Sequence, residues 1–131
     1  MRKLTAHIVP GGGAELEIQV QDEPGQGGAY HKYGVYGFHS KGNPSADETC
    51  NNDTRTLILF QNGPIKEFGV NGITHEALFA IIIDRLRSFQ AGPFKCLENA
   101  IALTYCEEAL MWSQKRTRGR IARGVEGTNT V

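Results

Sequence analysis

Two long helical patterns, separated by a single Gly-Pro break, constrain the fold more than any other feature of the chain. Thr74 is a good N-cap, and the pattern after it predicts a helix over residues 75 to about 90. Gly92-Pro93 ends this helix and starts the next, because proline is tolerated in a first helical turn but not in a helix interior. The second helix is expected from about residue 94 toward residue 122, so that the two form an antiparallel hairpin.

Apolar residues recur at helical spacing along both predicted helices. The first helix should span about 24 Å and the second about 42 Å, so the second overhangs the first from near Met111 and Trp112. Oligomerisation would cover these side chains economically, and the alternative is that the strand layer covers them within one copy. The expected stripes are Leu78, Ile81, Ile82, Leu86 and Phe89 on the first helix, and Leu97, Ile101, Tyr105, Leu110 and Trp112 on the second.

Strand patterns precede both helices. Alternation of polar and apolar residues predicts a strand over residues 15–20, and residues 30–38 and 55–61 are interpreted as two more. Asn62-Gly63 is the strongest hairpin signal in the chain, and it predicts that residues 65–70 return as a partner strand. Because every strand precedes every helix, we expect a segregated α+β fold with an N-terminal antiparallel sheet. Residues 22–28 and 41–53 have the composition of loops.

The length of the chain, 131 residues, suits one domain with a real core. We therefore expect a single domain over residues 1–131, with a β-rich part at 1–72 and a helical hairpin with a basic end at 73–131. The three cysteines, Cys50, Cys96 and Cys106, are odd in number and lack metal-binding spacing, which disfavours a disulfide scaffold or structural zinc. With no signal peptide or membrane-spanning run, a reducing cytoplasm fits best.

No catalytic constellation stands out in the sequence. It contains no nucleophile elbow, no Walker loop and no HExxH motif, and Glu107-Glu108 is interpreted as an exposed helix face rather than an acid/base pair. The four histidines lack ligand spacing, so no metal site or cofactor is predicted. A binding protein is favoured over an enzyme.

The end of the second helix is strongly basic, with five cations and no acid between Lys115 and Arg123. The segment from Lys115 onward carries these five cations against Glu126, so in a chain of net charge zero the first 114 residues sum to −4. Helical spacing aligns Arg116, Arg120 and Arg123 on one stripe, where guanidinium groups can bind phosphate oxygens in a bidentate manner. The alternative is that such cations only offset the helix dipole, as we expect for Lys115 and Arg118.

A second candidate site lies where the two helices meet. Phe89 and Gln90 end the first helix, and Glu98 and Asn99 lie about one turn into the second. A short turn can thus bring an aromatic ring and side-chain amides together, which is a common way to hold a single nucleotide. The alternative is that Phe89 is a core residue and Asn99 is solvated. Asn71, at the joint between sheet and helix, is a further candidate because a helix start offers N–H groups to a pyrophosphate.

From Phe60 onward the chain closely resembles the phage Thoeris anti-defence sponges, which share a helical hairpin with the phage anti-CBASS sponges. The segments that carry the resemblance are FQNGPIKEFGVNG, EALFAIIIDRL, SFQAGPF, ENAIALTYCEEALMW and KRTRGRIARGVEGT. The resemblance implies a protein without enzymatic activity that sequesters glycocyclic ADP-ribose, the Thoeris messenger, in the cytoplasm of the infected host. It also implies homo-oligomers, either dimers or hexamers, and possible binding of cyclic tri- or dinucleotides at separate sites.

The resemblance also implies roles for particular residues. Phe89 and Asn99 fall on positions that bind the glycocyclic nucleotide, whereas Arg116 and Arg120 fall on positions that bind cyclic trinucleotide phosphates where subunits meet. Arg123 has no such support and is an extension from the helical stripe. In the diverged strand region, Gly27, Gly28, Tyr30 and His31 are possible messenger contacts. Tyr105-Cys106 departs from the family pattern, and the bulky phenol could alter hairpin packing.

The competing hypothesis is a small regulatory nucleic-acid-binding protein that uses the basic helix end. Such binding through several phosphates should weaken steeply with ionic strength, whereas an enclosed nucleotide should be less sensitive. The net charge of zero counts against this hypothesis, because most such domains are clearly basic, so we expect no DNA or RNA partner. An enzyme acting on cyclic nucleotides ranks third.

Overall fold

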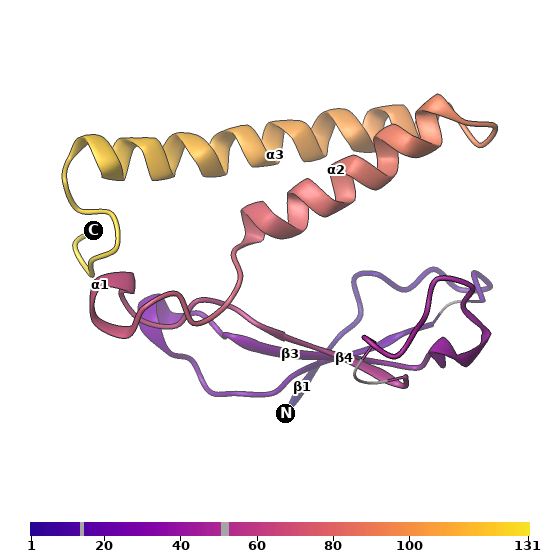
Figure 1. Cartoon of the computed structure of the whole chain (residues 1–131), viewed down its shortest axis with the longest axis horizontal. Helices are drawn as coiled ribbons and strands as arrows, with labels where there is room; N and C mark the ends of the chain where they lie inside the picture. The colour runs from indigo at the N-terminus through magenta and orange to yellow at the C-terminus, as the bar shows by residue number, and fades with distance from the viewer. Residues whose placement is uncertain (14, 51–52) are drawn as a thin grey trace. The chain divides into compact units, whose positions relative to one another are not determined.

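The computed structural model describes residues 1–13, 15–50 and 53–131 and divides the chain into two compact units, residues 1–62 and 63–131. The first unit is an antiparallel sheet with its loops, and the second contains two long helices (Figure 1). The predicted α+β fold, with an N-terminal antiparallel sheet followed by a helical hairpin, is therefore confirmed. Residues 51 and 52 of the predicted loop at 41–53 lie outside the described residues.

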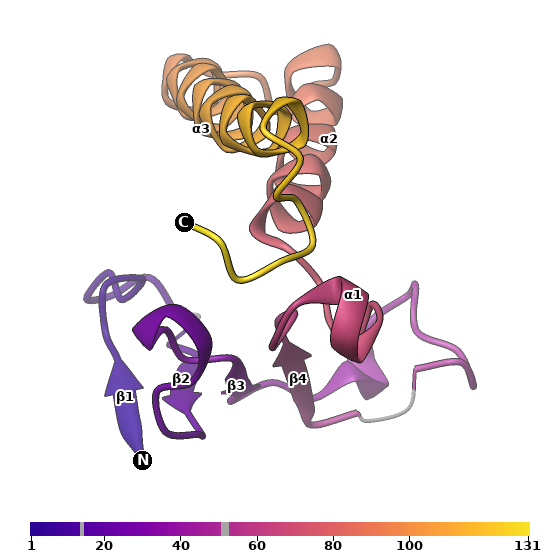
Figure 2. The ribbon, with the colours of Figure 1, turned by 90° about the vertical axis from the view of Figure 1, so that its left-hand side faces the viewer.

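Four strands lie side by side in sequence order in the first unit: β1 (Arg2–Leu4), β2 (Glu17–Val20), β3 (Lys32–Tyr36) and β4 (Arg55–Leu59) (Figure 2). Each neighbouring pair is antiparallel. The predicted strands at 15–20, 30–38 and 55–61 are confirmed within narrower bounds. Strand β1 was not predicted, because three residues are too few to show a period.

The two faces of the sheet differ in polarity, as a period of two requires. Val20 pairs with Tyr33, which pairs with Ile58, and Val20 is only 2% exposed, so this face carries the small core of the unit. On the other face the Glu17 carboxylate accepts hydrogen bonds from Lys3 and Gln19. These two bonds, the Lys3 bond first, hold the pKa of Glu17 below its usual value.

The predicted strand at 65–70 is wrong, because the structure has a short helix there, α1 (Ile65–Phe68). Pro64 precedes its first turn at φ −65°, the angle to which the proline ring holds the backbone and which suits a helix start. Gly69, at φ +71°, ends the helix after four residues. Asn62-Gly63 therefore leads into a helical turn rather than into a β-hairpin.

The helical hairpin consists of α2 (His75–Ala91) and α3 (Leu97–Ala122). Thr74 caps α2, as predicted, since its hydroxyl accepts a hydrogen bond from the Ala77 N–H at 3.2 Å. Helix α3 begins three residues later than predicted, because residues 92–96 form the turn and Cys96 is the N-cap.

Contacts along the hairpin correct the predicted start of the overhang. Arg87 forms an ion pair with Glu107 at 2.7 Å, and the Glu76 carboxylate lies 3.3 Å from the Thr117 hydroxyl. Helix pairing thus continues to Thr117, well past Met111. Helix α3 starts later than predicted, and α2 ends one residue later, at Ala91. Both differences shift the paired part of α3 toward its C-terminus.

The apolar stripe predicted on α2 is only partly the face that packs on α3. Ile83 is buried, whereas Ile81 and Ile82 are exposed. Three consecutive isoleucines place apolar side chains on more than one face, so the period could not select the packed one. On α3 four members of the predicted stripe form an exposed row, namely Leu97, Ile101, Tyr105 and Trp112. No helix in the described part of the chain is long and apolar enough to cross a membrane.

Candidate functional sites

The hairpin tip brings together Phe89, Gln90 and Asn99, three of the four predicted messenger contacts. Phe89 lies in the last turn of α2 and is 38% exposed. The Phe94 ring from the turn meets it edge to face at 6.4 Å between centroids, and the Arg85 guanidinium lies over it at 5.5 Å. Phe89 is therefore an accessible aromatic ring in a cationic setting rather than a core residue, which suits contact with a nucleotide.

Asn99 is the third residue of α3, close to the N-cap. Its N–H donates to the Cys96 thiol, with nitrogen and sulfur 3.4 Å apart. The side chain is half-buried, and none of the described residues forms a hydrogen bond with its amide. An amide in that position can donate to and accept from the edge of a base.

Gln90 is placed at the tip as predicted, but its amide is engaged by the protein. Its Oε1 accepts from the Cys96 N–H at 3.1 Å, and its Nε2 donates to the Cys96 carbonyl at 3.1 Å. The side chain thereby joins the end of α2 to the residue that caps α3.

Asn71 is exposed and lies in the segment before α2. The 17 residues of α2 span about 26 Å, so Asn71 is at the opposite end of that helix from Phe89. A single copy of the hairpin therefore does not bring Asn71 together with the other three predicted contacts.

The basic end of α3 lines a groove of about 470 Å³. Arg116 and Arg123, two members of the predicted stripe, line it, and Lys115, expected only to offset the helix dipole, joins them. The Lys115 ammonium lies 4.7 Å from the centre of the Trp112 ring, so cation and aromatic ring form one surface. Cations next to an exposed aromatic ring suit a ligand with phosphates and bases.

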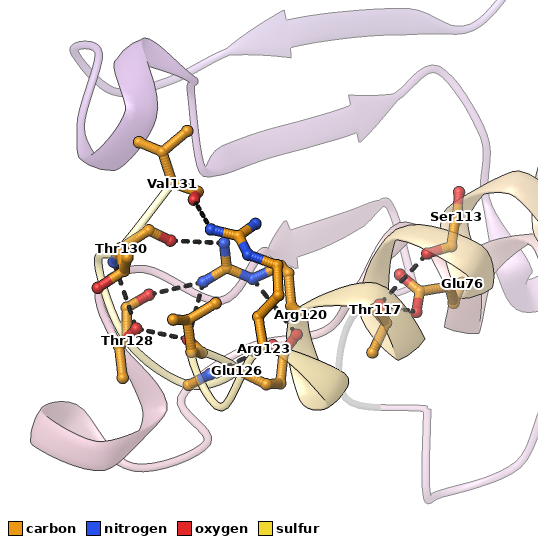
Figure 3. Close-up of polar contacts among 11 residues, drawn as sticks. Glu76, Ser113, Thr117, Arg120, Arg123, Glu126, Thr128, Thr130 and Val131 are labelled. Atoms are coloured by element: carbon orange, nitrogen blue, oxygen red, sulfur yellow. Dashed lines mark hydrogen bonds and ion pairs between the residues drawn. The ribbon is translucent and has the colours of Figure 1, made fainter.

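Arg120 also lines this groove, but it is the buried member of the stripe, at 9% exposed. Three of its N–H groups donate to main-chain carbonyls, at 2.6 Å to Thr130, 3.0 Å to Val125 and 3.1 Å to Thr128 (Figure 3). Its Nε faces the Glu126 carboxylate at 3.4 Å. The guanidinium thus holds the C-terminal segment in a fold back toward α1 (Figure 2).

The sequence GVEGT after α3 provides the geometry for this fold. Gly124 adopts φ +73°, and the N–H groups of Gly124 and Val125 bond the carbonyls of Ile121 and Arg120 at 3.0 Å each. This pattern is a Schellman motif, which turns the chain sharply at a helix end. Gly127 then accepts a hydrogen bond from the Lys66 N–H of α1.

The possible messenger contacts in the strand region lie in a turn and beside strand β3 of the sheet unit. Gly27 and Gly28 adopt positive φ in a tight turn, and the Tyr30 ring is covered by the Arg2 guanidinium at 4.7 Å. His31 is buried, with its N–H bonded to Asp22.

Comparisons with known proteins agree with the helical hairpin. The family model of the Acb2/Tad1 hairpin domain matches residues 52–118, and the chain belongs to that family. It is also similar to Thoeris anti-defense 1 of Bacillus phage SBSphiJ7, with 41% identity over 122 residues that span 93% of this chain and 75% of that protein. The resemblance found in the motifs is confirmed, and the similarity extends into the sheet unit.

Proposed function

We propose that this protein is a phage anti-defence sponge that binds and sequesters glycocyclic ADP-ribose without cleaving it. The observation that carries the proposal is the hairpin tip, where the exposed Phe89 ring and the half-buried Asn99 amide stand together in a chain of the Acb2/Tad1 hairpin family. The similarity to a protein named Thoeris anti-defense 1 supports the same role. The ring would stack on the base and Asn99 would bond its edge.

A sponge acts through affinity and copy number, so its site has to exclude water around the ligand and needs no turnover. Binding at the tip would lower the free messenger below the concentration that the host effector requires. The proposed place of action is the cytoplasm of the infected bacterium.

We further propose that the pocket is completed by a second copy of the chain. In the exposed row on α3, Tyr105 is 66% exposed and Trp112 is 60% exposed. A contiguous apolar surface of this kind is typical of a protein–protein interface. Two copies related by a twofold axis would bury such rows against each other. An antiparallel arrangement would also bring Asn71 of one copy toward Phe89 of the other, which α2 separates within one copy. A dimer or a hexamer would satisfy this requirement.

The basic groove at the end of α3 is the proposed second site, for cyclic tri- or dinucleotides. Arg116 would be the main phosphate contact, because it is exposed. Arg120 keeps fewer N–H donors for a ligand, since three already bond the C-terminal segment.

Calorimetric titration tests the proposal at two salt concentrations. We expect glycocyclic ADP-ribose to bind with an affinity that changes little between about 50 and 200 mM salt, and DNA or RNA oligonucleotides not to bind. Tight oligonucleotide binding that weakens steeply with salt, without binding of the messenger, would support the regulatory nucleic-acid-binding alternative instead.

A further inference from the structure

We infer that Gln90 is a positioning residue that sets where Asn99 stands, rather than a direct contact of the ligand. This inference rests on the proposed messenger site at the hairpin tip. Its basis is the pair of hydrogen bonds between the Gln90 amide and the two main-chain polar groups of Cys96, both at 3.1 Å.

The conformation of Cys96 explains why one amide can bind both groups. Cys96 is fully extended, with φ −156° and ψ 165°. In an extended residue the N–H and the C=O point to the same side, as they do in a hydrogen-bonded pair of antiparallel strands. The Gln90 amide therefore takes the place of a partner strand. This pairing also fixes the orientation of the amide, since only its oxygen can accept the Cys96 N–H and only its NH₂ group can donate to the Cys96 carbonyl.

Cys96 passes this restraint on to the first turn of α3. Its thiol sulfur accepts the Asn99 N–H at 3.4 Å, and its carbonyl accepts the Ala100 N–H at 3.1 Å. At the other end of the turn, the Phe89 carbonyl accepts the Gly92 N–H at 3.2 Å. The turn is therefore closed from both sides, and Gln90 fixes the spacing between the Phe89 ring and the Asn99 amide.

A direct ligand contact by the Gln90 amide would have a cost. If the amide turned toward a ligand, the Cys96 N–H would lose its acceptor and the Cys96 carbonyl would keep only the Ala100 N–H. An unpaired main-chain group is unfavourable unless water replaces the bond. A preorganised tip avoids that cost, because the contacts stand in place before the ligand arrives.

A double-mutant cycle tests the inference with glycocyclic ADP-ribose as the probe. Gln90→Met keeps the length of the side chain and removes both hydrogen bonds, and we expect it to weaken binding about tenfold. In an Asn99→Ala background the same change should have almost no further effect, because the lost interaction is the one that Gln90 positions. Equal losses in both backgrounds would overturn the inference and make Gln90 an independent contact. Gln114→Met, on the hairpin away from the tip, should leave the affinity unchanged.

Two further measurements separate positioning from a merely structural role. Gln90→Glu keeps the acceptor for the Cys96 N–H but lacks the donor at neutral pH, so its affinity should rise toward that of the original protein as the carboxyl is protonated. A flat pH profile would contradict the inference. In the free protein, amide hydrogen exchange at Cys96 and Asn99 should speed up about tenfold in Gln90→Met. Unchanged exchange would overturn the inference without any ligand, whereas failure of the original protein to bind the messenger would count against the proposed function alone.

Discussion

The Arg120 guanidinium donates a hydrogen bond to the main-chain carbonyl of Thr130 at 2.6 Å, ten residues further along the chain. Together with the bonds to Val125 and Thr128, this contact ties the C-terminal segment to the end of α3. Two arginines one helical turn apart thus have different environments, because Arg116 is exposed in the groove while Arg120 is buried. A row of cations in the sequence therefore serves both the fold and the candidate site.

Removal of Arg120 should release the C-terminal segment. Arg120→Ala leaves three carbonyls and the Glu126 carboxylate without their cation, and we expect it to lower the free energy of unfolding by about 3 kcal/mol. Chemical denaturation measures the loss, and limited proteolysis should cut after residue 123. Arg118→Ala, an exposed neighbour on α3, is the matched control and should change the stability little. A segment that stays protected in Arg120→Ala would contradict this account of the fold.

Two glycines five residues apart should respond to alanine with opposite signs. Gly124 has φ +73°, so Gly124→Ala should destabilise the protein by about 1 kcal/mol through backbone strain alone, since nothing lies within 4 Å of the added methyl. Gly119 lies inside α3, and the space around an added methyl group is equally open there. Gly119→Ala should therefore stabilise the protein by about 0.5–1 kcal/mol. Thermal melts of the two variants check the signs, and a gain from Gly124→Ala would rule out the Schellman turn.

The two candidate sites should be separable by mutation. Phe89→Ala or Asn99→Ala should weaken glycocyclic ADP-ribose binding by about 1–3 kcal/mol and spare a cyclic trinucleotide. Arg116→Ala should do the reverse. Titration of each variant with both ligands gives the comparison. Parallel loss of both ligands in every variant would argue for one shared site or for unfolding.

Self-association should depend on the exposed row of α3. Tyr105→Asp places a charge in the middle of that row and should shift the protein toward monomers, as measured by light scattering during size-exclusion chromatography. Arg118→Asp changes an exposed residue of α3 outside that row and should leave the mass unchanged. If the protein is a monomer at micromolar concentration before any substitution, the proposed two-copy pocket is wrong.

The helices were the part of the fold that the sequence predicted best. Thr74 and Gly92-Pro93 act locally, through a cap and a break, so their effect can be inferred without tertiary contacts. The strand at 65–70 was predicted wrongly, because the Asn62-Gly63 signal outweighed Pro64, whose fixed φ starts a helical turn. The packed face of α2 was ambiguous, since Ile81, Ile82 and Ile83 leave no single stripe.

The sequence indicated which candidate residues lie near one another, but not the environment of each side chain. Helical spacing grouped Arg116 with Arg120, and the short turn between the helices grouped Phe89 and Gln90 with Asn99. Neither pattern could show that Arg120 is buried by the C-terminal segment, or that the Gln90 amide is paired with Cys96, because both depend on how residues beyond a helix end fold back. Gly124, the glycine just past the end of α3, was the available signal for the burial of Arg120, since glycine at that position permits a Schellman turn that folds the chain back.

The fate of bound messenger tests the central claim most directly. The protein is incubated with glycocyclic ADP-ribose, separated from free ligand by filtration and then denatured by heat, and the released material is identified by mass spectrometry. We predict that the messenger is retained with the folded protein and is released intact in stoichiometric amount. Recovery of a hydrolysed product, or passage of the messenger through the filter, would contradict the proposal of a sponge.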